Sequence, residues 1–168
     1  MINDLEQITP RTAFFPTRLK TFAPIPLRLI VGCGFIAHGC SKITHGPERF
    51  VGILTALGVP SPEIMGWATI LVELLGGLAI LLGGFVRPAS LPMTAVLIVA
   101  ALTVHLQYGF SSIKFQAVTA AGPQFGPPGY ELDLLYLACL AALVLGGSGP
   151  YSVDGLLASL KAKRRSQN

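Results

Sequence analysis

Four long apolar segments, separated by polar or Gly- and Pro-rich stretches, dominate the pattern of hydrophobic and polar positions along the chain. A helix crosses the ~30 Å hydrocarbon layer of a bilayer with about 20 residues, because each residue adds about 1.5 Å. The pattern therefore predicts an all-α membrane protein, a bundle of four transmembrane helices at about residues 24–43, 62–86, 89–109 and 131–148. We expect one transmembrane domain over residues 24–157, with tails at residues 1–23 and 158–168.

Two loops fall on the same side of the membrane if the four helices alternate in direction. The loop at residues 44–61 contains the apolar run FVGILTALGV, which predicts either a short helix along the membrane interface or a surface helix that only packs. The loop at residues 110–130 is rich in Gly and Pro. Loops of that length in compact domains are commonly binding segments or lids, unless they are disordered.

Composition and charge refine this picture. An apolar content of 52%, a charged content of 12% and a mean hydropathy of +0.64 exclude a water-soluble domain. The net charge of +4 does not indicate binding to nucleic acid, since the basic residues lie beside the predicted helices. Eight Lys and Arg residues lie on the side of the two tails, against three on the other side. We therefore expect a multi-pass protein of the cell membrane, with both termini cytoplasmic and the first apolar segment retained instead of cleaved as a signal peptide.

Ionisable residues inside the predicted helices are the candidate functional residues, because each costs roughly 2.5 to 3.5 kcal/mol at the centre of a membrane helix unless it finds a partner. All but one of them fall in the outer half of the bilayer. On the second helix, Gly66, Glu73, Gly77 and Gly84 share a face, which places the carboxylate where another helix approaches. The candidates are Arg28, His38, Lys42, Glu73, His105 and Glu131.

We expect two arrangements of these side chains. Arg28, at the inner end of the first helix, reaches toward Glu73 near the midplane. His38, Lys42, His105 and Glu131 meet at one depth and form an outward-facing ligand site beneath the loop at residues 110–130. An alternative is that Arg28, Lys42 and Glu131 extend to water at the membrane boundaries.

The three cysteines, Cys33, Cys40 and Cys139, show neither a CxxC pair nor a metal-ligand spacing. We expect them to be buried as small apolar residues, and we expect no metal site.

Several segments carry a resemblance to a known family: RLIVGCGFIAHGCSKI, then FVGILTALGVPSPEIMGWATILVELLGGLAILLGGFVRPAS, then VHLQYGF, and finally GYELDLLYLACLAALVLGGSGPYSVDGLL. Over residues 25–157 the chain resembles the DoxX family of four-helix membrane proteins. The resemblance rests on an R-L-x-x-G-x-x-F-x-x-H-G-x-x-K pattern, an E-x-x-G-G pair, a His in the third helix and a G-x-E opening of the fourth. The matching positions are Arg28, Gly32, Phe35, His38, Gly39, Lys42, Glu73, Gly76, Gly77, His105, Gly129 and Glu131.

The resemblance implies a subunit or accessory of a membrane-associated oxidoreductase system, linked to quinone or to a sulfur compound. The sequence shows no heme motif, flavin fingerprint or cysteine pair, so we expect no covalently bound cofactor, and electrons would pass to quinone or a partner subunit. Two alternatives stay open: a small-solute or proton-coupled permease, and a non-enzymatic membrane scaffold. The sequence specifies neither the substrate nor the oligomeric state.

Overall fold

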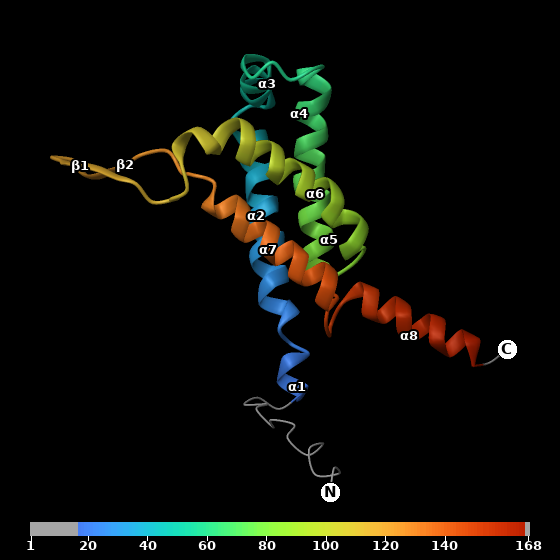
Figure 1. Cartoon of the computed structure of the whole chain (residues 1–168). Helices are drawn as coiled ribbons and strands as arrows, with labels where there is room; N and C mark the ends of the chain where they lie inside the picture. Colours follow the sequence, from blue (N-terminus) through green and yellow to red (C-terminus); the bar gives the residue numbers. More distant parts are fainter. Residues whose placement is uncertain (1–16, 167–168) are drawn as a thin grey trace, which may run out of the picture.

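Helices make up most of the structure, a computed structural model that describes residues 17–166. The predicted tail at residues 1–23 therefore lies largely outside the described residues. Figure 1 shows the course of the chain. The helices are α1 (Thr17–Lys20), α2 (Pro24–Thr44), α3 (Pro47–Ala56), α4 (Pro62–Leu71), α5 (Gly77–Leu82), α6 (Val86–Ala100), α7 (Glu131–Gly146) and α8 (Val153–Arg165). Two π-helical segments, η1 (Val72–Gly76) and η2 (Ala101–His105), continue α4 and α6, and a 3₁₀ turn, η3 (Leu106–Tyr108), follows η2.

Three continuous helices in the described part of the chain are long and apolar enough to cross a membrane. They run over Pro24–Thr44 (21 residues), Pro62–Leu82 (21 residues) and Val86–Tyr108 (23 residues). Helix α7 has 16 residues, which give a length of about 24 Å, less than the ~30 Å of the hydrocarbon layer. The structure thus agrees with a helical membrane protein, and the fourth span stays a prediction.

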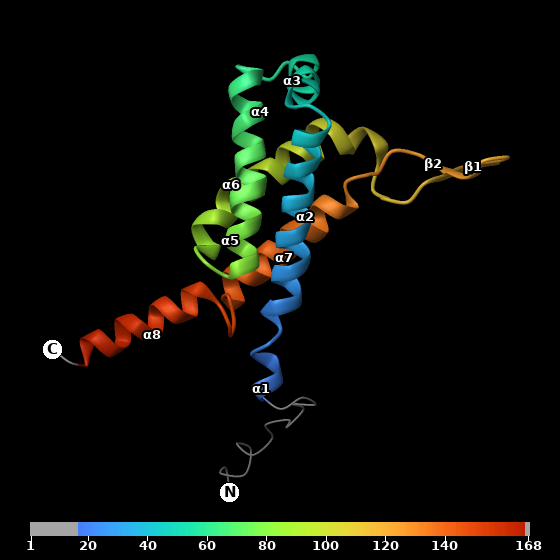
Figure 2. The ribbon, with the colours of Figure 1, turned by 180° about the vertical axis from the view of Figure 1, so that it is seen from behind.

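The all-α prediction needs one correction, because the loop at residues 110–130 of this mostly helical structure contains a β-hairpin. Strands β1 (Phe115–Thr119) and β2 (Gly122–Phe125) pair antiparallel, and the rings of Phe115 and Phe125 meet edge to face at 6.3 Å. The run FQAVT favours a strand, and Gly122 supplies the positive φ of 108° that the tight turn requires. The hairpin projects away from the helices in both views (Figures 1 and 2) and does not lie over them as a lid.

The helices pack around a core between α2, α5, α6 and α7. Val31, Ile80, Met93 and Leu143 are fully buried there. Helices α2 and α5 touch backbone to backbone at two glycines: a Cβ on Gly32 would lie 2.9 Å from the carbonyl oxygen of Gly77, and the reverse distance is also 2.9 Å. Close approach at small residues is the usual way in which membrane helices associate.

The strip predicted to face protein on the second helix does so. Its four residues, Gly66, Glu73, Gly77 and Gly84, are all buried.

The cysteines differ from expectation. Cys33 and Cys40 are exposed and Cys139 is half-buried. The two exposed thiols lie seven residues apart and therefore share one outer face of α2, where a small apolar side chain suits lipid as well as it suits a core.

The bundle has two distinct ends, and the residues of the site are located relative to them. Helix α3 lies at the end where α2 ends and α4 begins, and we call this the α3 end (Figure 2). The helix predicted in the first loop is therefore present. Helix α8 leaves the opposite end, the α8 end, and runs through the boundary that was predicted at residue 157.

Candidate functional site

An ion pair between Lys42 and Glu73 is the central feature of the α3 end. The ammonium of Lys42 donates to both oxygens of the carboxylate, at 2.6 and 2.7 Å. Lys42 comes from the last turn of α2, and Glu73 comes from the π-helical segment η1. The side chain of Glu73 is only 7% exposed and that of Lys42 is 20% exposed. A charge this deep is stable only with its partner, so the pair ties α2 to η1.

The expected pairing of Arg28 with Glu73 is wrong. The guanidinium of Arg28 instead donates to five backbone carbonyls at the α8 end, and Glu73 lies toward the other end. Two acceptors, Ile80 and Leu81, belong to the last turn of α5. The other three lie in the loop that joins α7 to α8, at Ser148, Pro150 and Tyr151. A guanidinium suits this task because its planar fork offers five donors, and a helix end leaves carbonyls without partners.

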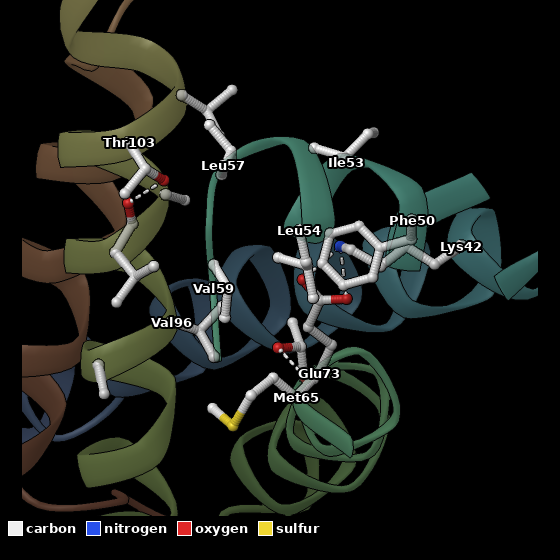
Figure 3. Close-up of a pocket in the computed structure, with 15 residues that line it drawn as sticks. Lys42, Phe50, Ile53, Leu54, Leu57, Val59, Met65, Glu73, Val96 and Thr103 are labelled. Carbon is white, nitrogen blue, oxygen red and sulfur yellow. Dashed lines mark hydrogen bonds and ion pairs between the residues drawn. The ribbon is translucent and has the colours of Figure 1, made fainter. Parts of the chain in front are cut away.

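A cavity of about 210 Å3 opens beside the ion pair. Figure 3 shows Lys42 and Glu73 on one wall, with the ring of Phe50 next to the ammonium. The Nζ atom lies 4.8 Å from the centre of that ring, a cation–π distance. Helix α3 and the loop after it contribute Leu54 and Val59, and α6 with η2 forms the opposite wall.

The ion pair supplies the charged groups of this cavity and its free side-chain hydrogen-bond donor. Two threonines also line the wall, but each donates its hydroxyl proton within its own helix. Thr69 donates to the carbonyl oxygen of Met65 at 2.8 Å, and Thr103 donates to that of Val99 at 2.7 Å. The cavity is therefore an apolar chamber with one charged pair, a common design of sites that bind small organic molecules.

His105 forms a second polar pair, separate from the first. Its Nδ1 atom lies 2.6 Å from the carboxylate of Asp133, which is almost fully buried in the first turn of α7. Glu131 was expected in one ligand site with His105, but it accepts a hydrogen bond from the backbone N–H of Ser112 and so holds the loop before the hairpin. Residues 131 and 133 differ by about 200° around a helix, so only one of them can face η2. That rotation makes Glu131 and Asp133 alternatives for the residue that faces η2, and the contact with His105 selects Asp133.

The remaining candidate, His38, is exposed on α2. Within residues 17–166 it makes no hydrogen bond or ion pair, and it does not line the cavity. The expected cluster of His38, Lys42, His105 and Glu131 is thus distributed over separate places. Sequence reasoning also missed Phe50, whose ring packs on Lys42.

One member of each pair lies in a π-helical segment, Glu73 in η1 and His105 at the end of η2. The two segments also flank the cavity, since Glu73 and Thr103 both line it. Single π-helical turns inside α-helices occur frequently at functional sites. Among the described residues, no group of three or more His, Cys, Asp or Glu side chains could hold a metal ion.

Comparisons with known proteins give one family and two relatives. A family model described as DoxX matches residues 23–106, which include Lys42, Glu73 and His105. An uncharacterized protein of Haemophilus influenzae is 30% identical over 130 residues, covering 76% of this chain and 85% of that protein. A Bacillus subtilis protein named "Putative oxidoreductase CatD" is 33% identical over 84 residues, covering 50% of this chain and 60% of that protein. No solved structure matches the chain significantly.

Proposed function

Because the chain belongs to the DoxX family of membrane proteins, we propose that it is a subunit or accessory of a membrane-associated oxidoreductase system whose Lys42–Glu73 cavity binds the head group of a quinone. The proposal draws on the relative named as an oxidoreductase and on the chemistry of the cavity. The apolar chamber with one buried charged pair is the observation that carries it.

The size of the cavity fits a single ring. An engineered protein cavity of about 150 Å3 lined by apolar side chains holds benzene, so about 210 Å3 accommodates a six-membered ring with small substituents. The apolar walls, among them Leu54 and Val96, suit the faces of such a ring.

The donor set fits the oxygens of the ring. Lys42 is a hydrogen-bond donor and can bond a quinone carbonyl, whereas Glu73 can accept a hydrogen bond from the hydroxyl of the reduced form. A bound quinone would supply the capacity for two electrons and two protons. Because the sequence carries no flavin fingerprint, heme motif or cysteine pair, the electrons are proposed to come from a partner subunit.

We place the protein in the cell membrane with four spans, α7 being the fourth, and with the α8 end in the cytoplasm. Basic residues support this orientation, because Lys and Arg are enriched in cytoplasmic segments. Arg87 lies in the first turn of α6 at the α8 end, and four basic residues lie in α8: Lys161, Lys163, Arg164 and Arg165. Helix α7 supports the span count, since Leu140 and Leu143 lie in the common core.

Binding of a tail-free benzoquinone ring to the purified protein in lipid nanodiscs tests the proposal. We expect saturable binding that falls at least about tenfold in Lys42→Met, since the donor at the carbonyl is lost. Lys114→Met is the matched control, because Lys114 also lies over an aromatic ring, at 5.7 Å from that of Tyr108, but outside the cavity.

Failure of the ring to saturate, or equal effects of the two lysine substitutions, would contradict the proposed site. A quinol-linked assay with thiosulfate as electron donor, set beside solute flux in proteoliposomes, tests the wider role. Solute flux without any quinol formation would contradict the redox role and would indicate that the protein transports a solute.

A further inference from the structure

The mouth of the cavity is formed by exposed apolar side chains. Ile53 and Leu57 of the α3 region are 52% and 40% exposed, Met65 of α4 is 45% exposed and Val99 of α6 is 50% exposed. Ala95 and Thr103 complete the opening, and both are also exposed. We call these six residues the rim.

The rim carries no charge, and its one hydroxyl, on Thr103, is bonded to the carbonyl of Val99 in its own helix. The charged groups lie deeper, at Lys42 and Glu73. Figure 3 shows this order, with the ion pair on the far side of the chamber from Thr103. A mouth that opened to water would expose this apolar ring of side chains at a cost, whereas acyl chains solvate it without cost.

The depth of the rim also indicates that the mouth opens to the lipid chains. Helix α6 continues through η2 and η3 as one candidate span from Val86 to Tyr108, whose middle residue is Leu97. Ala95 and Val99 flank that residue, each within about 3 Å of it along the helix axis. One side of the mouth therefore lies at the centre of the span, and α3 closes the chamber above it at the α3 end.

From this geometry we infer that the cavity takes its ligand sideways from the bilayer, and that the ligand is a membrane-dissolved molecule with a ring-sized carbonyl head and an apolar tail. The head fills the chamber beside Lys42 and Glu73. A cavity of about 210 Å3 has no room for a long tail as well, so the tail lies across the rim and continues among the lipid chains. The inference rests on the proposed function and adds the class of ligand and its route.

Photolabelling tests the route in the unaltered protein. The probe is a decyl-tailed benzoquinone with a diazirine on the tail carbon nearest the ring, used in lipid nanodiscs. We expect crosslinks within residues 53–57 and 95–103, and we expect excess decylubiquinone to suppress them. Suppressible crosslinks confined to other faces of the bundle, or to the hairpin at residues 115–125, would overturn the inference.

A pair of variants tests whether the tail occupies the rim. Val99→Trp narrows the mouth, and Ile98→Trp places the same bulk on the neighbouring position of the same helix, which is 44% exposed and does not line the cavity. We expect the affinity for decylubiquinone to fall about tenfold in the first variant and less than about twofold in the second. Equal affinity losses would count against the inference.

The tail-free ring separates this inference from the proposed function. If that ring binds in a Lys42-dependent manner but the tailed probe does not label the rim, the cavity is a quinone site and the sideways route is wrong. If the ring does not bind at all, the proposed function is wrong, and the sideways route, which rests on it, is wrong as well.

Discussion

At the scale of single residues, Arg28 shows how backbone carbonyls can hold a charge near a membrane, with the carboxylate of Asp154 close enough to interact electrostatically. Its guanidinium is buried and bonds five carbonyl oxygens at distances of 2.8 to 3.3 Å. Hydrogen bonds to charged groups contribute about 1.5 to 3 kcal/mol each, and a buried carbonyl that loses its donor carries a cost of similar size. One side chain therefore joins α2, the end of α5 and the loop before α8.

We predict that Arg28→Lys lowers the free energy of unfolding by about 2 to 4 kcal/mol, although the charge is kept, because an ammonium offers three donors and lacks the planar fork. Unfolding in detergent, followed by circular dichroism, measures the change. Arg87→Lys is the control, since Arg87 is exposed at the same end of the bundle, and it should change stability by less than about 1 kcal/mol. A loss of stability as small in Arg28→Lys as in the control would refute the assigned role.

A double-mutant cycle tests the Lys42–Glu73 pair. Lys42→Met or Glu73→Gln alone should each destabilise the protein by about 2 to 4 kcal/mol, because each leaves a buried group without its partner. The double variant should lose less than the sum of the two, with a coupling of about 1 to 3 kcal/mol. Thermal unfolding in detergent gives the three values, and simple additivity would contradict a direct pair.

At the scale of the elements, hydrophobic patterning predicted the helices well but could not predict their register. The expected segments at 24–43 and 62–86 correspond to Pro24–Thr44 and Pro62–Leu82. Register depends on where two antiparallel helices touch, and here Gly32 faces Gly77.

That contact brings Ile36 level with Glu73, so Lys42 lies about 9 Å away along the axis and Arg28 about 12 Å in the other direction. Lys42 is therefore the nearer cation. The sequence predicted Arg28 at the inner end of the first helix and Lys42 in its outer part, but the distance of each from Glu73 depends on where the two helices touch. The hairpin was not predicted either. A Gly- and Pro-rich segment can form a loop without strands or a tight turn between two short strands, and its composition does not distinguish the two.

The contact between His105 and Asp133, which connects η2 to α7, gives a prediction at the scale of the elements. Asp133→Asn removes the charged partner of His105, so amide hydrogen exchange should quicken over residues 101–108, while residues 110–112 keep their protection. Glu131→Gln should do the reverse, because the side chain at that position holds the N–H of Ser112. Hydrogen exchange with mass spectrometry resolves the two segments. Identical exchange patterns in the two variants would show that the contact at Asp133 and the contact at Glu131 are not independent.

At the scale of the whole molecule, the two ends differ in chemistry. The α3 end carries the cavity and the exposed hairpin, whereas the α8 end carries the Arg28 junction and a helix with basic residues in its last turns. In α8 the apolar side chains Leu156, Leu157 and Leu160 remain exposed. Such a helix suits the surface of a membrane, where its apolar face meets lipid and its basic end meets anionic head groups.

Orientation in the membrane is testable with single cysteines in a background from which Cys33, Cys40 and Cys139 have been removed. With the α8 end in the cytoplasm, an impermeant thiol reagent should label Ser111→Cys on intact cells, and Ser166→Cys only after the membrane is opened. Both positions are exposed, so access through the membrane decides the result. Labelling of position 166 without position 111 on intact cells would invert the orientation.

The carbonyls that hold Arg28 have a consequence for biosynthesis. Three of them follow Arg28 by 120 to 123 residues in the chain, so they are made long after the first helix has left the ribosome. During that interval the guanidinium must be kept in water or lipid head groups, because at most the carbonyls of Ile80 and Leu81 are available to it. The first helix can therefore settle at its final depth only after residues 148–151 have been made. A nascent chain that stops before residue 148 would therefore lack three of the five carbonyl acceptors that hold Arg28 in the folded protein.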